Sequence, residues 1–420
     1  MENPIRQTGG AFLTGFLFAV VSCAGREEAP TDEELQSRAV QLADSFIVAD
    51  THIDVPFRLR EKMEDVSVRT KEGDFDYPRA RDGGLDLAFM SIFVPSSYET
   101  AGARSLADTL IDMVEGLWKG SPGKFAPAFT VESARSNQQA GRISLPMGME
   151  NGSPLEGSLA NLKHFYDRGI RYITLTHSKN NHICDSSYDK ERRWNGLSPF
   201  GVEVVMEMNR LGIMIDVSHI SDSTFYQVMR HSVAPVIASH SSCRHFTPGW
   251  ERNISDDMIR RLAAGGGVVQ INFGSAFLTE DLRTKWESGW KNIDKYLEDH
   301  KMSRTDEGAE AFIRKYREEH GIGYADITDV VDHIDHVVKL VGVDHVGFGS
   351  DFDGVGDSLP TGLKDVSMYP NLIYELLKRG YSEEDARKIS GENVLRVWTQ
   401  VEQVAGRLKG VELAGQTSGL

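Results

Sequence analysis

The chain has 420 residues, of which 40% are hydrophobic and 26% are charged, a composition typical of a globular protein and unlike that of a disordered or fibrous one. Its 62 Asp and Glu residues outnumber its 46 Lys and Arg residues, and the net charge of −16 argues against a nucleic-acid partner. Three cysteines are too few for a disulfide scaffold, and no apolar run reaches the roughly 18–20 residues of a membrane-spanning helix.

The first 40 residues are predicted to be a targeting segment and a linker. Residues 11–21 form an apolar run with the length of a signal-peptide core, and small residues lead from it to Cys23, a pattern that resembles a bacterial lipobox. We therefore expect a lipoprotein signal peptide at 1–23, a membrane-anchoring lipid on Cys23 and an acidic tether at 24–40. The alternative is an ordinary cleaved signal with an incidental cysteine. The lipoprotein interpretation places the protein in a bacterial cell envelope, on a side that the sequence leaves open.

From about residue 41, short apolar or β-branched runs alternate with amphipathic helical patterns. The runs predicted as strands are 46–49, 87–93, 144–149, 171–175, 214–217, 236–238, 268–272 and 346–349. Eight strand–helix units favour an α/β fold of the (β/α)8 TIM-barrel type over residues 41–404. An open doubly wound sheet is the alternative, but it fits less well because no GxGxxG follows the first strand.

Two segments lie outside this alternation. A charged stretch at about 279–320, between the seventh and eighth predicted strands, is expected to be a helical insertion that forms a lid or an oligomer surface. Two amphipathic helices are predicted at 371–379 and 383–397, and residues 405–420 are expected to be a C-terminal tail.

Residues that bind metals or transfer protons stand at the ends of most predicted strands. They are His52 and Asp54 after the first strand, Glu150 after the third, His177 after the fourth, His219 after the fifth, His240 after the sixth and Asp351 after the eighth. In a barrel these ends converge on one mouth, where active sites lie. Imidazoles and carboxylates suit zinc, and a carboxylate shared by two ions would make a hydrolytic site that activates water and polarises a carbonyl. A further carboxylic acid is then needed to protonate the leaving amine.

Other polar residues are predicted to be structural. Asp216 lies inside the fifth strand and is expected to anchor backbone, while His333 and His336 are expected on the flank of a helix rather than in a metal site. The histidines assigned to loops or to the surface are His182, His231, His245, His320 and His345. Cys184 and Cys243 are compatible with a disulfide in an oxidising compartment or with two buried free thiols.

Several segments carry a family resemblance in combination and in order. They are 50–54 (DTHID), 149–152 (MENG) running on to 169–178 (GIRYITLTHS), 215–219 (IDVSH), 239–242 (SHSS), 252–257 (RNISDD) and 347–355 (GFGSDFDGV). Together they resemble the membrane (renal) dipeptidase family, peptidase family M19, from about residue 40 to residue 400. The resemblance implies a binuclear zinc dipeptidase on a (β/α)8 barrel. Asn151 departs from the family, since animal members usually have glycine there, and the insertion is more similar to bacterial members.

The resemblance also implies a ligand set for two zinc ions. His52 and Asp54 would hold one ion, His219 and His240 would hold the other, and Glu150 would bridge them. A hydroxide bridging the two ions would attack the peptide carbonyl.

Three further residues receive roles from the same resemblance. His177 would contact the substrate and stabilise the oxyanion, and Asp351 would carry a proton to the leaving amine. Arg252 would bind the free carboxylate of the dipeptide, with Arg244 as its rival because the stretch between His240 and Arg252 is irregular.

The expected function is therefore zinc-dependent hydrolysis of dipeptides, including those with a C-terminal D-residue. For an envelope lipoprotein, fragments of peptidoglycan peptides are suitable substrates, and family members are often homodimers. Three alternatives stay open: a metallohydrolase of a lactone or phosphoester bond on the same barrel, a zinc-binding lipoprotein without catalysis, and a structural envelope protein that leaves the convergent strand ends unexplained.

Overall fold

The computed structural model describes residues 30–302 and 307–417, together with Met1. Its centre is a barrel of parallel strands, closed where the last strand returns to pair with the first. The barrel strands are β1 (Val48–Ile53), β2 (Leu85–Phe93), β5 (Met147–Glu150), β6 (Ile170–Thr174), β7 (Met214–Asp216), β8 (Ile237–Ala238), β9 (Val268–Ile271) and β10 (Val346–Phe348). The closed order confirms the predicted TIM barrel and excludes the open sheet.

The third predicted strand, 144–149, is divided in the structure. β4 (Ile143–Ser144) pairs with β2 and with a short strand that the sequence analysis did not predict, β3 (Phe125–Ala126). β5 then begins at Met147, directly after Pro146. Proline has no N–H to donate to a ladder, so the strand is interrupted there and resumes one residue later.

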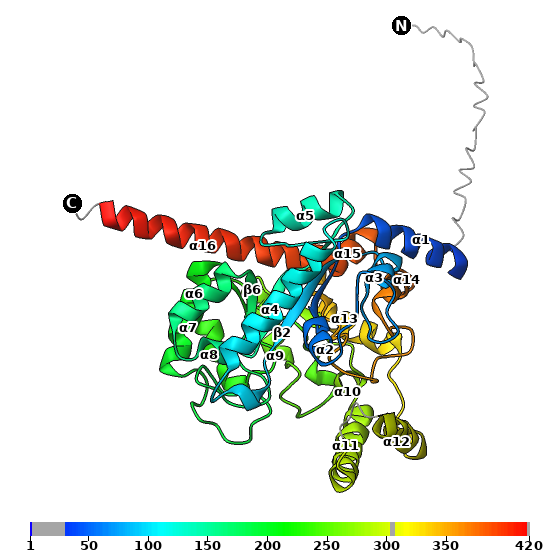
Figure 1. The fold of residues 1–420 in the computed structure, drawn as a ribbon. Coiled ribbons are helices and arrows are strands. Elements are labelled where there is room, and N and C mark those ends of the chain that lie inside the picture. The colour runs from blue at the N-terminus through cyan, green and yellow to red at the C-terminus, as the bar shows by residue number, and fades with distance from the viewer. Residues whose placement is uncertain (2–29, 303–306, 418–420) are drawn as a thin grey trace.

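Helices surround the barrel (Figure 1). They are α1 (Asp32–Ser45), α2 (Val55–Glu61), α3 (Tyr77–Asp82), α4 (Ala103–Gly120), α5 (Val131–Gln139), α6 (Leu159–Asp167), α7 (Pro199–Leu211), α8 (Asp222–His231), α9 (Asp256–Ala264), α10 (Ser275–Leu278), α11 (Glu280–His300), α12 (Glu307–Glu319), α13 (Ile327–Val341), α14 (Tyr369–Lys378), α15 (Glu383–Arg387) and α16 (Asn393–Thr417). None of the helices in the described part of the chain is long and apolar enough to cross a membrane.

The N-terminal expectations are only partly within the described residues. The predicted signal peptide and Cys23 lie outside them. The predicted tether is not extended throughout, because α1 begins at Asp32, where Thr31 and Glu34 form a capping box. The helix buries Ala39, Leu42 and Ala43 on one face, so the second half of the predicted tether belongs to the fold.

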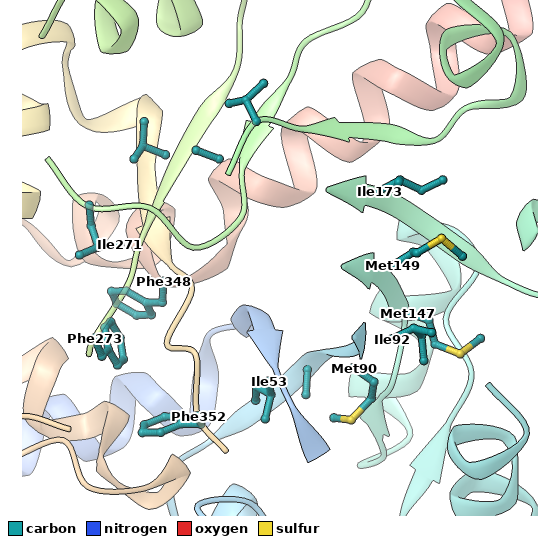
Figure 2. Packing of buried hydrophobic residues seen from close by; sticks show 14 of the residues in the cluster. Ile53, Met90, Ile92, Met147, Met149, Ile173, Ile271, Phe273, Phe348 and Phe352 are labelled. Atoms are coloured by element: carbon teal, nitrogen blue, oxygen red, sulfur yellow. The ribbon is translucent and has the colours of Figure 1, made fainter. Parts of the chain in front are cut away.

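Successive side chains of each strand point alternately toward the surrounding helices and into the barrel interior. Met147 and Met149 on β5 and Ile173 on β6 lie side by side in the apolar cluster that also holds side chains of the surrounding helices (Figure 2). The intervening Gly148 leaves room for Tyr172, since a Cβ at this position would lie 1.9 Å from the Tyr172 ring. The interior therefore holds a tyrosine where a larger neighbour would exclude it, and this tyrosine reaches the site described below.

The two ends of the barrel differ. A second apolar cluster joins the beginnings of the strands, such as Leu87 and Val268, to Leu395 and Trp398 of α16. The helix continues to Thr417 through the residues predicted as a tail. Of these, Ala405 is buried and Leu408 packs partly against the second cluster, whereas residues 406, 407 and 409–411 are exposed. α11 and α12 form the predicted helical insertion after β9 and project from the other end of the molecule (Figure 1).

Candidate metal centre and active site

The predicted strand-end residues meet at the C-terminal mouth of the barrel around Glu150. One carboxylate oxygen of Glu150, Oε2, lies 3.4 Å from His52 Nε2, which is itself 3.4 Å from Asp54 Oδ2. The other oxygen, Oε1, lies 3.2 Å from His219 Nε2 and 3.4 Å from His240 Nε2. All five side chains are buried. Glu150 thus stands between two groups of possible ligands, as the sequence analysis expected of a shared carboxylate.

The arrangement of polar atoms at this mouth is better explained by bound metal ions than by hydrogen bonds between the side chains. His52 Nε2 and Asp54 Oδ1 are buried without a hydrogen-bond partner among the described residues, although buried polar atoms normally have one. His219 Nε2 and His240 Nε2 converge to 2.8 Å. Sets of potential ligand atoms within 4.8 Å of one another are His52–Glu150–His240, Glu150–His177–His219 and His52–Asp54–Asp351. Imidazole nitrogens and carboxylate oxygens in such sets are ligands of zinc and related ions.

Electrostatics keep most of these groups in ligand-competent forms. Burial, reinforced by the Arg252 cation, holds the pKa values of His219 and His240 well below their ordinary value, so both imidazoles are neutral. Burial alone would raise the pKa of Glu150, but the imidazoles around it hold that pKa well below its usual range. His52 differs, because Tyr172 and the carboxylates beside it outweigh burial and hold its pKa well above the ordinary value.

Hydrogen bonds behind the cluster fix the ring orientations. His52 Nδ1 lies 2.8 Å from the Tyr172 hydroxyl, and His240 Nδ1 lies 2.7 Å from Ser239 Oγ. Ser239 in turn donates to the buried Asp216, which also accepts from backbone N–H groups, as its predicted anchoring role requires. Such partners set the tautomer and direction of a ligand histidine. Tyr172 and Ser239 were not predicted as site residues, because their positions inside or just after a strand carry no signal of their own.

Backbone strain is concentrated at the same mouth. Asn151, His219, Asp351 and Asp353 all have positive φ, between 63° and 78°. Residues other than glycine adopt this conformation at a cost, and they do so mainly where the surrounding structure requires it, often in functional sites. Asn151 offsets its cost by donating to Val94 O at 2.8 Å and by accepting from its neighbours.

The residues expected to act on substrate border the cluster. His177 Nε2 lies 3.6 Å from Glu150 Oε1, and its ring packs edge-on against Phe93 at 4.8 Å. Asp351 Oδ1 lies 4.0 Å from His52 Nε2. Burial raises the pKa of Asp351 to about 7, against the opposing effect of His52. Asn272, the last residue of the seventh predicted strand, holds the other oxygen of Asp351 and was missed although it occupies the same strand-end position.

The two arginine candidates occupy different places. Arg252 is buried against the cluster, with Nη2 3.1 Å from His219 Nε2 and 2.9 Å from the carbonyl of His240. Its Nε has no hydrogen-bond partner among the described residues. Arg244 lines the wider cavity, but both of its terminal nitrogens bind the Asp222 carboxylate, at 2.6 and 2.7 Å. Of the two arginines, only Arg252 therefore contacts the residues of the cluster.

A cleft with two lobes, of about 1000 and 810 Å³, opens over the cluster. Both lobes are lined by His177, Trp286, Trp290 and Val355. The two tryptophans come from α11, so the insertion forms part of the wall of the site. A lid or an oligomer surface was predicted here, and the structure shows that the insertion supplies these two side chains to the wall of the cleft.

The residues predicted to be structural gave one correction. His333 is wholly buried rather than on a helix flank, because its Nδ1 accepts from the Cys243 backbone N–H at 2.9 Å while its Nε2 meets Leu278 O at 3.0 Å. Cys184 and Cys243 are both buried free thiols.

A parallel (β/α)8 barrel with imidazoles and carboxylates converging at its C-terminal mouth defines a metal-dependent hydrolase. The family model of the membrane dipeptidases, peptidase family M19, matches residues 36–412. The chain belongs to this family and is a metallo-dipeptidase, as the resemblance predicted.

The relatives and solved structures found agree with this class. Dipeptidase 3 of Mus musculus is 32% identical over 383 residues, which cover 89% of this chain and 68% of the relative. An uncharacterised dipeptidase of Schizosaccharomyces pombe is 34% identical over 401 residues, covering 90% and 85% of the two chains. The probable dipeptidase PvdM of Pseudomonas aeruginosa has a TM-score of 0.76 at 28% identity, covering 89% of this chain and 100% of the other. A Rhodobacter sphaeroides metallopeptidase, liganded with a phosphinate mimic of L-Ala-D-Ala, has a TM-score of 0.69 at 26% identity, covering 85% and 99%.

Proposed function

We propose that this dipeptidase works with two zinc ions and accepts dipeptides whose C-terminal residue has the D configuration. The observation that carries the proposal is the position of Glu150. Its two oxygens face different ligand groups, His52 with Asp54 on one side and His219 with His240 on the other. When bound, two zinc ions would supply the Lewis acidity that activates water and polarises the peptide carbonyl.

Two residues beside this centre stabilise the oxyanion and transfer the proton. His177 stands beside Glu150 with its Nδ1 free of hydrogen bonds among the described residues, and it stabilises the oxyanion that forms on the carbonyl. Asp351 faces the cluster through Oδ1, while Oδ2 is held by Asn272, so it is positioned to receive a proton and pass it to the leaving amine.

Arg252 accounts for the restriction to dipeptides. A guanidinium with an unpartnered Nε beside the cluster suits the free carboxylate of a short peptide. A longer peptide or a C-terminal amide leaves this buried cation without an anionic partner, which costs binding and rate. The phosphinate mimic of L-Ala-D-Ala bound by the Rhodobacter sphaeroides relative supports a D-residue at that position.

A substrate panel tests the proposal. The purified chain from residue 24 is assayed on L-Ala-L-Ala, L-Ala-D-Ala, the C-terminal amide of L-Ala-D-Ala, an alanine tripeptide, a lactone and a phosphoester. We expect hydrolysis of the two dipeptides only. Arg252→Lys should raise KM for dipeptides strongly, while Arg244→Lys should affect them far less. Cleavage confined to the lactone or phosphoester, or equal effects of the two arginine variants, would contradict the proposal.

We also propose that Cys23 carries the lipid that anchors the protein in a bacterial envelope. The support is the apolar run at 11–21 followed by small residues and the cysteine. Metabolic labelling with a fatty acid in a bacterial host should label the full chain and leave the Cys23→Ser variant unlabelled. Equal labelling of the two, or none in either, would refute the anchor. The homodimer implied by the family resemblance is tested on the same preparation by sedimentation.

A further inference from the structure

A second group of metal-competent residues lies away from the barrel mouth. His245 belongs to the short 3-10 helix η3 (Arg244–Phe246), Asp256 is the first residue of α9, and His336 lies on α13. None of these residues has a role in the proposed reaction. The three elements follow β8, precede β9 and precede β10, so the group is assembled by the tertiary fold and not by one local motif.

The three side chains offer ligand atoms at distances suited to one ion. His336 Nε2 lies 2.8 Å from Asp256 Oδ1, and one ligand atom from each of the three residues lies within 4.8 Å of the other two. Ligands about 2.1 Å from a tetrahedral zinc ion lie about 3.4 Å from one another. Small rotamer adjustments of exposed or half-buried side chains are therefore enough to close the set around an ion.

Ring contacts hold His245 and His336 in place in addition to the ion pair between His336 and Asp256. The imidazole of His245 stacks on that of His336, with ring centroids 4.3 Å apart and planes inclined by 19°. Phe246 packs edge-on against His245 at 4.9 Å, and it also contacts the buried His333 ring at 4.3 Å. This anchored phenylalanine fixes η3, so the backbone that carries His245 is already placed next to the His336–Asp256 pair.

The chemistry of the set selects a transition metal. Two imidazoles with one carboxylate and open positions for water are ligands of Zn²⁺ and its neighbours, whereas Mg²⁺ and Ca²⁺ prefer oxygen. His245 is exposed, and Asp256 and His336 are half-buried, so an ion can enter from solvent and keep bound water.

We propose that His245, Asp256 and His336 form a third zinc site of this chain, separate from the metal centre in the barrel. An ion there links η3 to α9 and α13. The segment between η3 and α9 carries Trp250, which lines the substrate cleft, and Arg252. The site therefore holds a wall of the cleft in place from outside and contributes to its stability without touching substrate.

Zinc counting on the loaded enzyme tests this directly. The wild-type chain and its variants are dialysed against the same free zinc concentration, and the bound metal per chain is measured by elemental analysis. We expect His245→Ala and Asp256→Asn to bind one ion fewer than the wild type while keeping dipeptide hydrolysis. His231→Ala removes another exposed histidine outside the set and should leave the count unchanged.

A second measurement guards against a variant that is merely less well folded. The thermal midpoint of the wild type should rise with added zinc beyond saturation of the barrel centre, and that rise should be absent in His245→Ala. A barrel variant, His240→Ala, should lose metal at the mouth and keep the rise. Equal zinc counts in the wild type and in His245→Ala, or an equal zinc-dependent rise in their midpoints, would overturn the proposal.

Discussion

Asn272 donates a hydrogen bond to Asp351, with 2.7 Å between Nδ2 and Oδ2. The two residues follow adjacent barrel strands, β9 and β10, so this bond ties two strand ends together at the mouth. It leaves the other oxygen of Asp351 directed at the cluster, 4.0 Å from His52 Nε2. The orientation of the proposed proton carrier is thus set by a neighbour that does not itself react.

Removal of this bond should slow the reaction without weakening substrate binding. Asn272→Ala frees the Asp351 carboxyl to rotate, and we expect kcat for dipeptides to fall by roughly tenfold or more while KM changes little. Steady-state kinetics measure both. Asn371→Ala removes an exposed asparagine side chain on α14 and should leave both constants unchanged. A rise in KM with an unchanged kcat would show that Asn272 acts on binding instead.

Metal analysis separates the ligands from the residue that acts on substrate. Glu150→Gln keeps the size of the side chain but removes the charge between the two groups, so we expect loss of bound metal together with activity. His177→Ala should keep the full metal content, and its kcat should fall by a factor of roughly 10²–10³, since the change removes only the stabilisation of the oxyanion. Glu156→Gln, at an exposed position in the loop before α6, is the control for the glutamate change. Loss of metal in His177→Ala would make His177 a ligand.

The cleft wall formed by the insertion depends on one buried cation. Arg317 of α12 stacks on Trp286 and on Tyr324, each with its guanidinium carbon 4.5 Å from the ring centroid, and its Nη1 donates to Asp357 at 2.6 Å. This places the tryptophan of the wall against the loop that follows β10.

Arg317→Ala should therefore loosen the wall. We expect a several-fold rise in KM with little change in kcat, and a stability loss of about 2 kcal/mol from the two stacked contacts. Kinetics and denaturant unfolding measure the two effects. Arg314→Ala removes an exposed cation that lines the same cleft on the same helix. It should change KM and stability much less than Arg317→Ala does. Identical kinetics in the wild type and Arg317→Ala would show that the wall does not contact substrate.

His333 gives the fold a pH dependence of its own. Burial lowers the pKa of His333 from its ordinary 6.5 to about 3, because protonation would place a charge in the interior, and the Leu278 carbonyl opposes this only in part. The stability this contributes is fully present above pH 6.5 and is lost as the pH falls from 6.5 toward 3.

The free energy of unfolding of His333→Gln should fall less steeply over this pH range than that of the wild type, even if it is lower at neutral pH. Denaturant titrations at a series of pH values measure the slope. His231→Gln, a change at an exposed histidine, should keep the wild-type slope. Parallel slopes for the wild type and His333→Gln would mean that His333 does not contribute to acid sensitivity.

The cluster of metal-competent residues at the mouth was predictable from the sequence because the strands are short and these residues stand at their ends. Once the barrel is inferred, parallel strands bring His52, Glu150, His219 and His240 to the same rim. Asn272 and Tyr172 escaped prediction because they act by holding other side chains, and which partner each one reaches depends on strand register.

Features set by packing between distant segments were not predictable in the same way. His333 lies among apolar residues on α13, and its ring is buried because Cys243 and Leu278, both distant in the sequence, lie against its two nitrogens. Residues 405–420 were predicted as a tail because the apolar pattern weakens beyond Val404. In the structure α16 continues to Thr417, and Ala405 and Leu408 pack against the fold while residues 409–411 stay exposed.

Metal removal and restoration test the central claim most directly. The enzyme is stripped with a chelator, zinc is added back stepwise, and hydrolysis of L-Ala-D-Ala is followed together with bound metal in the His245→Ala background, which removes the proposed outer site. We expect no activity in the stripped enzyme and a full return of activity at two zinc ions per chain. Undiminished hydrolysis after stripping, or two bound zinc ions with no hydrolysis of any dipeptide, would contradict the account.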